Sequence, residues 1–135
     1  MANYMIFAID NDDDLHTNAK FLRYMDERRV MGKMDGTMVL CIGSYNDELE
    51  RSYMVTESDF FYHIAGSGFV DDQQSVLEVS DGHKGKTYAT LKFKDERADD
   101  KFLGVFKSIS PYEIGEHSSW TYRSDLGIYF VTEEV

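Results

Sequence analysis

The sequence predicts a mixed α+β fold, namely a ferredoxin-like split β-α-β-β-α-β sheet with additional C-terminal strands. Apolar or alternating segments of strand length recur along the chain. Two segments with helical spacing, at about 14–29 and 58–65, lie between the earlier of these strand segments. The length of 135 residues is that of one domain, so we expect residues 1–135 to fold as a single domain. Hydrophobic residues make up 42% of the chain, enough to bury a core.

Residues 4–9 are apolar throughout, which favours a strand covered on both faces. The acidic run 10–14 then supplies turn and N-cap residues, and its charge suits the start of a helix. The spacing predicts a helix over about 14–29. Its expected buried face carries Leu15, Asn18, Ala19, Leu22 and Met25, with Phe21 beside it.

The remaining elements follow from the same patterns. Asp81-Gly82-His83-Lys84-Gly85 predicts a hairpin turn, whereas segment 102–109 fits no single pattern. We expect further strands over 38–42, 51–55, 75–79 and 87–93, a short helix over 58–65, and a final hairpin from 120–122 and 128–131.

Charge and cysteine content restrict the possible partners. The net charge is −11, and residues 1–83 hold 16 Asp and Glu against 6 Lys and Arg. This balance disfavours direct binding to nucleic acid or to anionic membranes, and it favours a basic protein partner. The single cysteine, Cys41, lies between apolar neighbours, which predicts a buried thiol. With neither a signal peptide nor a membrane-length apolar run, we expect a cytoplasmic protein.

No metal or catalytic motif emerges. The acids Asp10 and Asp12–Asp14 beside His16 fail the calcium-loop pattern, because Leu15 and Phe21 occupy the positions that require Gly and Glu. The four histidines lack zinc-site spacing. We therefore expect no metal and no cofactor, and a protein that binds rather than catalyses.

Short motifs resemble a family of small bacterial and phage proteins of unknown function. They are Asn18, Gly43-Ser44-Tyr45, Glu50-x-Ser52-Tyr53-x-Val55 and Gln74-Ser75-Val76-Leu77, within residues 4–110. The long acidic run before the first helix and the Gly66–Asp72 loop depart from that pattern. The resemblance implies the fold and a phage or bacterial setting, but no activity.

One set of polar residues could converge at an end of the predicted sheet. The set comprises Asn18, Tyr45, Glu50, Ser52 and Gln74. A polar side chain on an apolar helix face needs hydrogen-bond partners, so Asn18 is the first candidate of this set. The set predicts either a ligand or partner site, or a structural hydrogen-bond network.

Three functional hypotheses follow. In the first, the protein is a small acidic, phage-encoded binding protein that binds a basic host protein, for example at its nucleic-acid-binding surface, and modulates or inhibits it. Its acidic face would comprise Asp12, Asp13, Asp14, Asp47 and Glu48. In the alternative, it is a small enzyme or binder of a nucleotide-like ligand that uses the polar set. In the third, a free sheet edge pairs with another copy of the chain. A pocket of a few hundred Å3 would favour the second hypothesis, and a continuous acidic face without a pocket the first.

Overall fold

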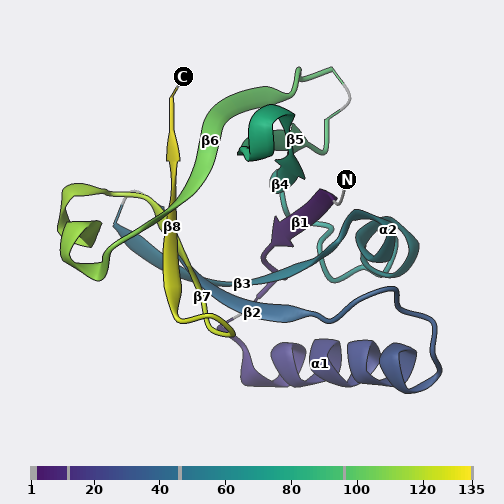
Figure 1. Ribbon diagram of the computed structural model, residues 1–135. Coiled ribbons are helices and arrows are strands. Elements are labelled where there is room, and N and C mark those ends of the chain that lie inside the picture. Colours follow the sequence, from purple (N-terminus) through teal and green to yellow (C-terminus); the bar gives the residue numbers. More distant parts are fainter. Residues whose placement is uncertain (1–2, 12, 46, 96, 135) are drawn as a thin grey trace.

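Eight strands pair side by side and close into an antiparallel β-barrel in the computed structural model, which describes residues 3–11, 13–45, 47–95 and 97–134 (Figure 1). The strands are β1 (Asn3–Phe7), β2 (Val39–Tyr45), β3 (Glu48–Thr56), β4 (Ser75–Asp81), β5 (Thr87–Phe93), β6 (Lys101–Ile109), β7 (Trp120–Arg123) and β8 (Ile128–Glu133). The helical segments are α1 (Leu15–Val30), α2 (Glu57–Asp59) with the π-helical η1 (Phe60–Ile64), and the 3-10 turns η2 (His83–Gly85) and η3 (Pro111–Glu116). Around the barrel the order is β1-β3-β2-β7-β8-β6-β5-β4, and β4 pairs with β1 again.

The predicted ferredoxin-like α+β sheet is wrong, because the four C-terminal strands close the sheet instead of extending it. Segment 102–109, which fits no single sequence pattern, lies in β6 and pairs with β5 on one side and β8 on the other. β7 then pairs with β2 and completes the ring. Each of the eight described strands has two neighbours, so the described residues leave no unpaired strand of the kind that the third hypothesis uses.

Closure depends on a local bend in β6. The register between β5 and β6 shifts at Ala89 and Thr90, as at a β-bulge, which bends a strand and increases its twist. Opposite this shift, Gly104 has a φ of +121°, and a Cβ built on it would lie 2.1 Å from the carbonyl oxygen of Glu133. Only glycine permits both this backbone conformation and so close an approach of β8.

The protein has two hydrophobic cores, one on each side of the barrel wall. In β1, Met5 and Phe7 belong to the outer core, whereas Ile6 belongs to the inner core. The outer core includes residues of α1 and η1: Phe21, Met25, Phe60 and Ile64. The inner core includes Cys41, Met54, Leu77, Val79, Ala89 and Phe106. β1 is therefore covered on both faces, as its apolar sequence predicts.

α1 begins as predicted but presents a different face. Asp14 caps it, since its carboxylate accepts hydrogen bonds from the His16 amide at 3.0 Å and the Thr17 hydroxyl at 2.9 Å. The buried residues are Phe21 and Met25, whereas Leu15 is 79% exposed. The ring of Phe21 contacts those of Phe7, Tyr53 and Phe69, and this large aromatic contact decides the orientation.

Within the described part of the chain, no helix combines the length and the apolar composition needed to cross a membrane.

Candidate functional site

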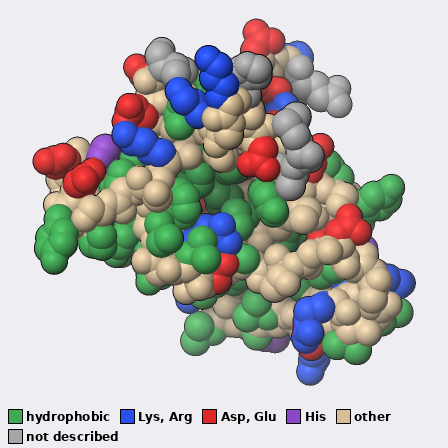
Figure 2. Space-filling model, in the orientation of Figure 1, with side chains coloured by type: hydrophobic (Ala, Val, Ile, Leu, Met, Phe, Trp, Pro, Cys, Tyr) green, Lys and Arg blue, Asp and Glu red, His purple; other side chains and the backbone are tan. Residues whose placement is uncertain are grey.

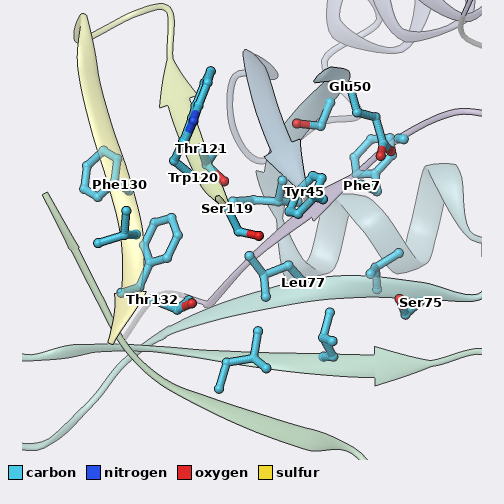
Figure 3. Close-up of a pocket in the computed structure, with 18 of the residues that line it drawn as sticks. Phe7, Tyr45, Glu50, Ser75, Leu77, Ser119, Trp120, Thr121, Phe130 and Thr132 are labelled. Carbon is cyan, nitrogen blue, oxygen red and sulfur yellow. The ribbon is translucent and has the colours of Figure 1, made fainter. Parts of the chain in front are cut away.

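A cavity of about 480 Å3 lies within the barrel, lined by residues from all eight strands (Figure 3). An eight-stranded barrel has an interior that side chains just fill or that holds one small ligand. Apolar side chains form much of the wall, among them Leu77, Leu91, Phe106 and Phe130. In the space-filling view, hydrophobic side chains gather around the centre of the face shown, where basic and acidic side chains also lie (Figure 2). The volume is typical of small-molecule sites.

Polar side chains meet where β3, β2 and β7 lie next to each other. In the register, Gly43 of β2 stands between Glu50 of β3 and Thr121 of β7. A Cβ on Gly43 would lie 2.6 Å from the ring of Tyr45, so the missing side chain leaves room for that ring. In Figure 3 the Tyr45 side chain lies between Glu50 on one side and Ser119 and Thr121 on the other.

The Tyr45 phenol is kept in its neutral form by its surroundings. Burial raises its pKa above the ordinary value; the Glu50 carboxylate adds to the rise, and a hydrogen bond with Thr121 opposes it. The residue as a whole is 38% exposed, and it lines the cavity. At neutral pH the group therefore has a proton to donate as well as lone pairs to accept.

Ser52 has a polar atom without a partner in the wall of the cavity. The residue is 2% exposed, and its hydroxyl oxygen is buried with no hydrogen-bond partner among the described residues. Leaving a buried hydroxyl without a hydrogen bond costs about 1–3 kcal/mol of folding free energy. Such groups are therefore rare in folded proteins and need an explanation.

The rim of the cavity is held in place by Asp10, a buried residue whose role the sequence did not reveal. Its carboxylate accepts hydrogen bonds from the Asp72 amide and from the Gln73 side-chain amide, both at 2.9 Å. The Asp10 amide donates to the carbonyl of Phe69. These bonds attach the segment before β4 to the end of β1, and so position Gln73 and Gln74 at the cavity.

Four of the five residues of the predicted polar set line this cavity: Tyr45, Glu50, Ser52 and Gln74. Asn18 does not. Its side-chain oxygen accepts a hydrogen bond of 2.6 Å from the Tyr53 hydroxyl, and Tyr53 belongs to the outer core. Asn18 therefore lies on the helix side of the sheet, where it makes a structural hydrogen bond. Whether the other four bind a ligand stays a prediction at this point.

Sequence reasoning missed the wall that the C-terminal strands provide. Ser119, Trp120 and Thr121 bring polar and aromatic groups, and Phe130 and Thr132 of β8 stand beside them. The strand patterns at 120–122 and 128–131 were visible in the sequence. Nothing in them indicates that this hairpin pairs with β2 and β6, which is what brings these side chains to Tyr45 and Glu50.

The predicted acidic face is only partly described. Asp13, Asp14, Asp47 and Glu48 are exposed, and Asp12 lies outside the described residues. Since β1 runs antiparallel to β3, the end of β1 and the β2–β3 turn lie at the same end of the barrel. The carboxylate of Asp14 is already used as the helix cap. A basic protein partner for these residues stays a prediction.

Metal binding and a second cavity are two other possible sources of ligand chemistry. Among the described residues no group of three or more His, Cys, Asp and Glu is arranged to hold a metal ion. A second cavity, of about 430 Å3, lies between η1 and the outer side of β4 and β5. Its Lys92 lies 2.7 Å from Asp100 and 3.8 Å from Glu78, so that charge is already neutralised.

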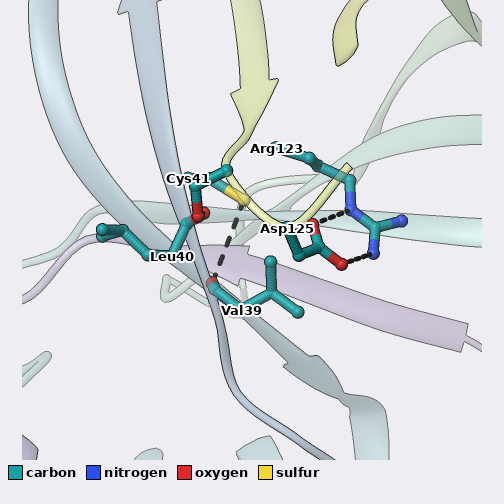
Figure 4. Close-up of polar contacts among 6 residues, drawn as sticks. Val39, Leu40, Cys41, Arg123 and Asp125 are labelled. Atoms are coloured by element: carbon teal, nitrogen blue, oxygen red, sulfur yellow. Dashed lines mark hydrogen bonds and ion pairs between the residues drawn. The ribbon is translucent and has the colours of Figure 1, made fainter. Parts of the chain in front are cut away.

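Cys41 is fully buried in β2, as its apolar neighbours predict (Figure 4). Burial raises the pKa of its thiol to about 11; the charge of nearby Arg123 lowers this pKa, and the charge of its ion-pair partner Asp125 raises it.

We expect the native protein to resist labelling by a maleimide or disulfide reagent at pH 8, because roughly one thiol in a thousand is then a thiolate and access is blocked. The urea-unfolded chain should be labelled within minutes. Equal labelling rates in both states would contradict the described position of Cys41.

No protein-family model matches the chain, and no curated protein matches it. The function is therefore inferred from the cavity.

Proposed function

We propose that this protein binds one small organic molecule inside its β-barrel, by contacts rather than by chemical conversion. The observation that carries the proposal is the cavity of about 480 Å3 with the unpaired Ser52 hydroxyl in its wall. A pocket of this size is what distinguishes the ligand hypothesis from the acidic-surface hypothesis. The protein's partner is then a small molecule.

The cavity wall has an apolar part and a polar part, and this division supports ligand binding. Apolar side chains, among them Leu77 and Phe106, would surround the body of the ligand, and its removal from water supplies most of the affinity. The polar groups of Tyr45, Ser52 and Thr121 would orient it. Such a combination of apolar walls with a few placed polar groups is typical of small-molecule sites.

Ser52→Ala provides a test with opposite effects on stability and binding. In the free protein the substitution removes an unpaired buried hydroxyl, so the melting temperature should stay the same or rise by a few degrees. Ligand binding should weaken about tenfold, because one hydrogen bond to the ligand is lost. A fall in melting temperature of the free protein would show that Ser52 serves the fold instead.

The ligand can be sought directly. The purified protein is incubated with a small-molecule extract of cells, separated by gel filtration, denatured, and the released compounds are identified by mass spectrometry. The wild type should retain a discrete compound that Ser52→Ala retains less, and that Thr132→Phe, which narrows the cavity from β8, excludes. If all three chains, each folded by circular dichroism, release the same compounds, the cavity is not a binding site.

A further inference from the structure

The unpaired hydroxyl of Ser52 lies in the interior of the barrel, away from the β2–β3 turn. In the register of these strands, Tyr45 stands opposite Glu48 at the turn, and Ser52 stands four residues further along β3, opposite Cys41. Cys41 is fully buried, and Met54, two residues beyond Ser52, is 6% exposed and belongs to the inner core. A ligand group that pairs with Ser52 would therefore be removed from water.

The surroundings of Ser52 suit neither sign of charge. Lys, Arg and His are missing among the described residues that line the cavity. Arg123 of β7 pairs opposite Cys41, but its guanidinium donates to both carboxylate oxygens of Asp125, at 3.1 and 2.7 Å. Glu50, the one acid of the described lining, is only partly buried and already interacts within the protein, so it needs no cation from a ligand. A buried charge without an opposite charge is strongly disfavoured.

An aromatic wall lies across the barrel from Ser52. In the strand order, β6 is four strands from β3 in either direction, which is the opposite side of a ring of eight. Phe106 of β6 and Phe130 of β8 both line the cavity, and their rings are parallel with centroids 5.1 Å apart. A flat ring of a ligand can stack on such rings, which adds to the gain from burying its surface.

From this we infer that the ligand is an uncharged molecule with a flat ring body, whose hydroxyl or carbonyl group forms a hydrogen bond with Ser52. The inference rests on the proposed function and names the class of its ligand. A serine hydroxyl donates to a carbonyl and accepts from a hydroxyl, so either group satisfies Ser52. The inferred ligand differs from the nucleotide-like ligand that the sequence indicated, since a nucleotide carries phosphate groups.

Matched compounds separate charge, shape and the hydrogen bond. Naphthalene bearing a hydroxymethyl, an aminomethyl or a carboxylate group provides the alcohol, the cation and the anion, and ethylnaphthalene is the hydrocarbon without a polar group. A straight-chain alcohol of similar apolar area tests the preference for a ring. Binding is followed by amide NMR shifts at Ser52 and Thr121. We expect the naphthalene alcohol to bind most tightly, and both charged compounds at least about tenfold more weakly.

Two serine variants test the hydrogen bond. Ser52→Ala should weaken the naphthalene alcohol about tenfold and leave the hydrocarbon within about twofold, and the retained hydrocarbon shows that the cavity is intact. Ser44→Ala is the matched control in β2. Ser44 is 4% exposed, its hydroxyl donates to the carbonyl of Ser118 at 3.3 Å, and it does not line the cavity. That variant should keep both affinities, although the lost hydrogen bond lowers its stability.

The outcomes distinguish the inference from the proposed function. If the amine, the carboxylate or the straight-chain alcohol binds more tightly than the naphthalene alcohol, the inference is overturned while the proposed function stands. The same holds if Ser52→Ala weakens the hydrocarbon as much as the alcohol, or if Ser44→Ala acts like Ser52→Ala. If no compound shifts the cavity signals, both the inference and the proposed function fail.

Discussion

Replacing Gly104 by alanine should destabilise the protein by about 3–5 kcal/mol. The φ of +121° is strained for any residue with a side chain, and the new Cβ would lie 2.1 Å from the Glu133 carbonyl oxygen. The clash involves backbone on both sides, so no side-chain rotation relieves it. Relief requires β6 and β8 to separate, which opens the barrel at the pairing that closes it.

Urea unfolding followed by tryptophan fluorescence measures this loss. Gly115→Ala is the control, because a Cβ there meets nothing within 4 Å, and it should change stability by no more than about 0.5 kcal/mol. If the two variants unfold at the same urea concentration, β6 and β8 do not approach each other as described. An opened barrel should also lose ligand binding, since the cavity walls come from both strands.

Phe21→Ala should cost about 3–5 kcal/mol, while Leu15→Ala costs less than about 1 kcal/mol. Phe21 is fully buried, and its ring contacts those of Phe7, Tyr53 and Phe69. Leu15 is 79% exposed, although the sequence pattern placed it on the buried face. The two variants therefore decide between the predicted and the observed orientation of α1.

Thermal and urea unfolding of both variants provide the comparison. The slope of the urea dependence should stay the same, so that the shift of the midpoint reports stability alone. A larger loss of stability for Leu15→Ala than for Phe21→Ala would instead support the orientation that the sequence spacing predicts. Neither Phe21 nor Leu15 lines the cavity, so ligand affinity should be retained wherever the chain is folded.

The candidate site was predictable to the extent that it depends on alternation within one strand. Glu50 and Ser52 are two residues apart, so a strand places them on the same face, and both line the cavity. Tyr53, the next residue in the strand, has its side chain on the opposite face, which α1 covers, and it is the partner of Asn18. The sequence grouped Asn18 with the others because the side of the sheet that α1 covers depends on tertiary packing.

The sequence by itself determined most of the local structure. Residues 87–93 form a strand with the predicted bounds, the helix expected over 14–29 extends from Leu15 to Val30, and the turn at 81–85 follows β4. The cap by Asp14 and the burial of Cys41 also follow from neighbouring residues alone. These features have local causes, namely side-chain spacing, capping and apolar surroundings.

Only the tertiary structure decided that the sheet closes, and with it that a cavity exists. The closing pairs join residues far apart in the chain, such as Gly43 with Thr121, and Val105 with Glu133. Backbone hydrogen bonds between strands are nearly independent of side-chain identity, so a strand pattern does not name its neighbour. The neighbour is selected by the packing of the whole barrel and by single positions such as Gly104, where a bend and a close approach coincide.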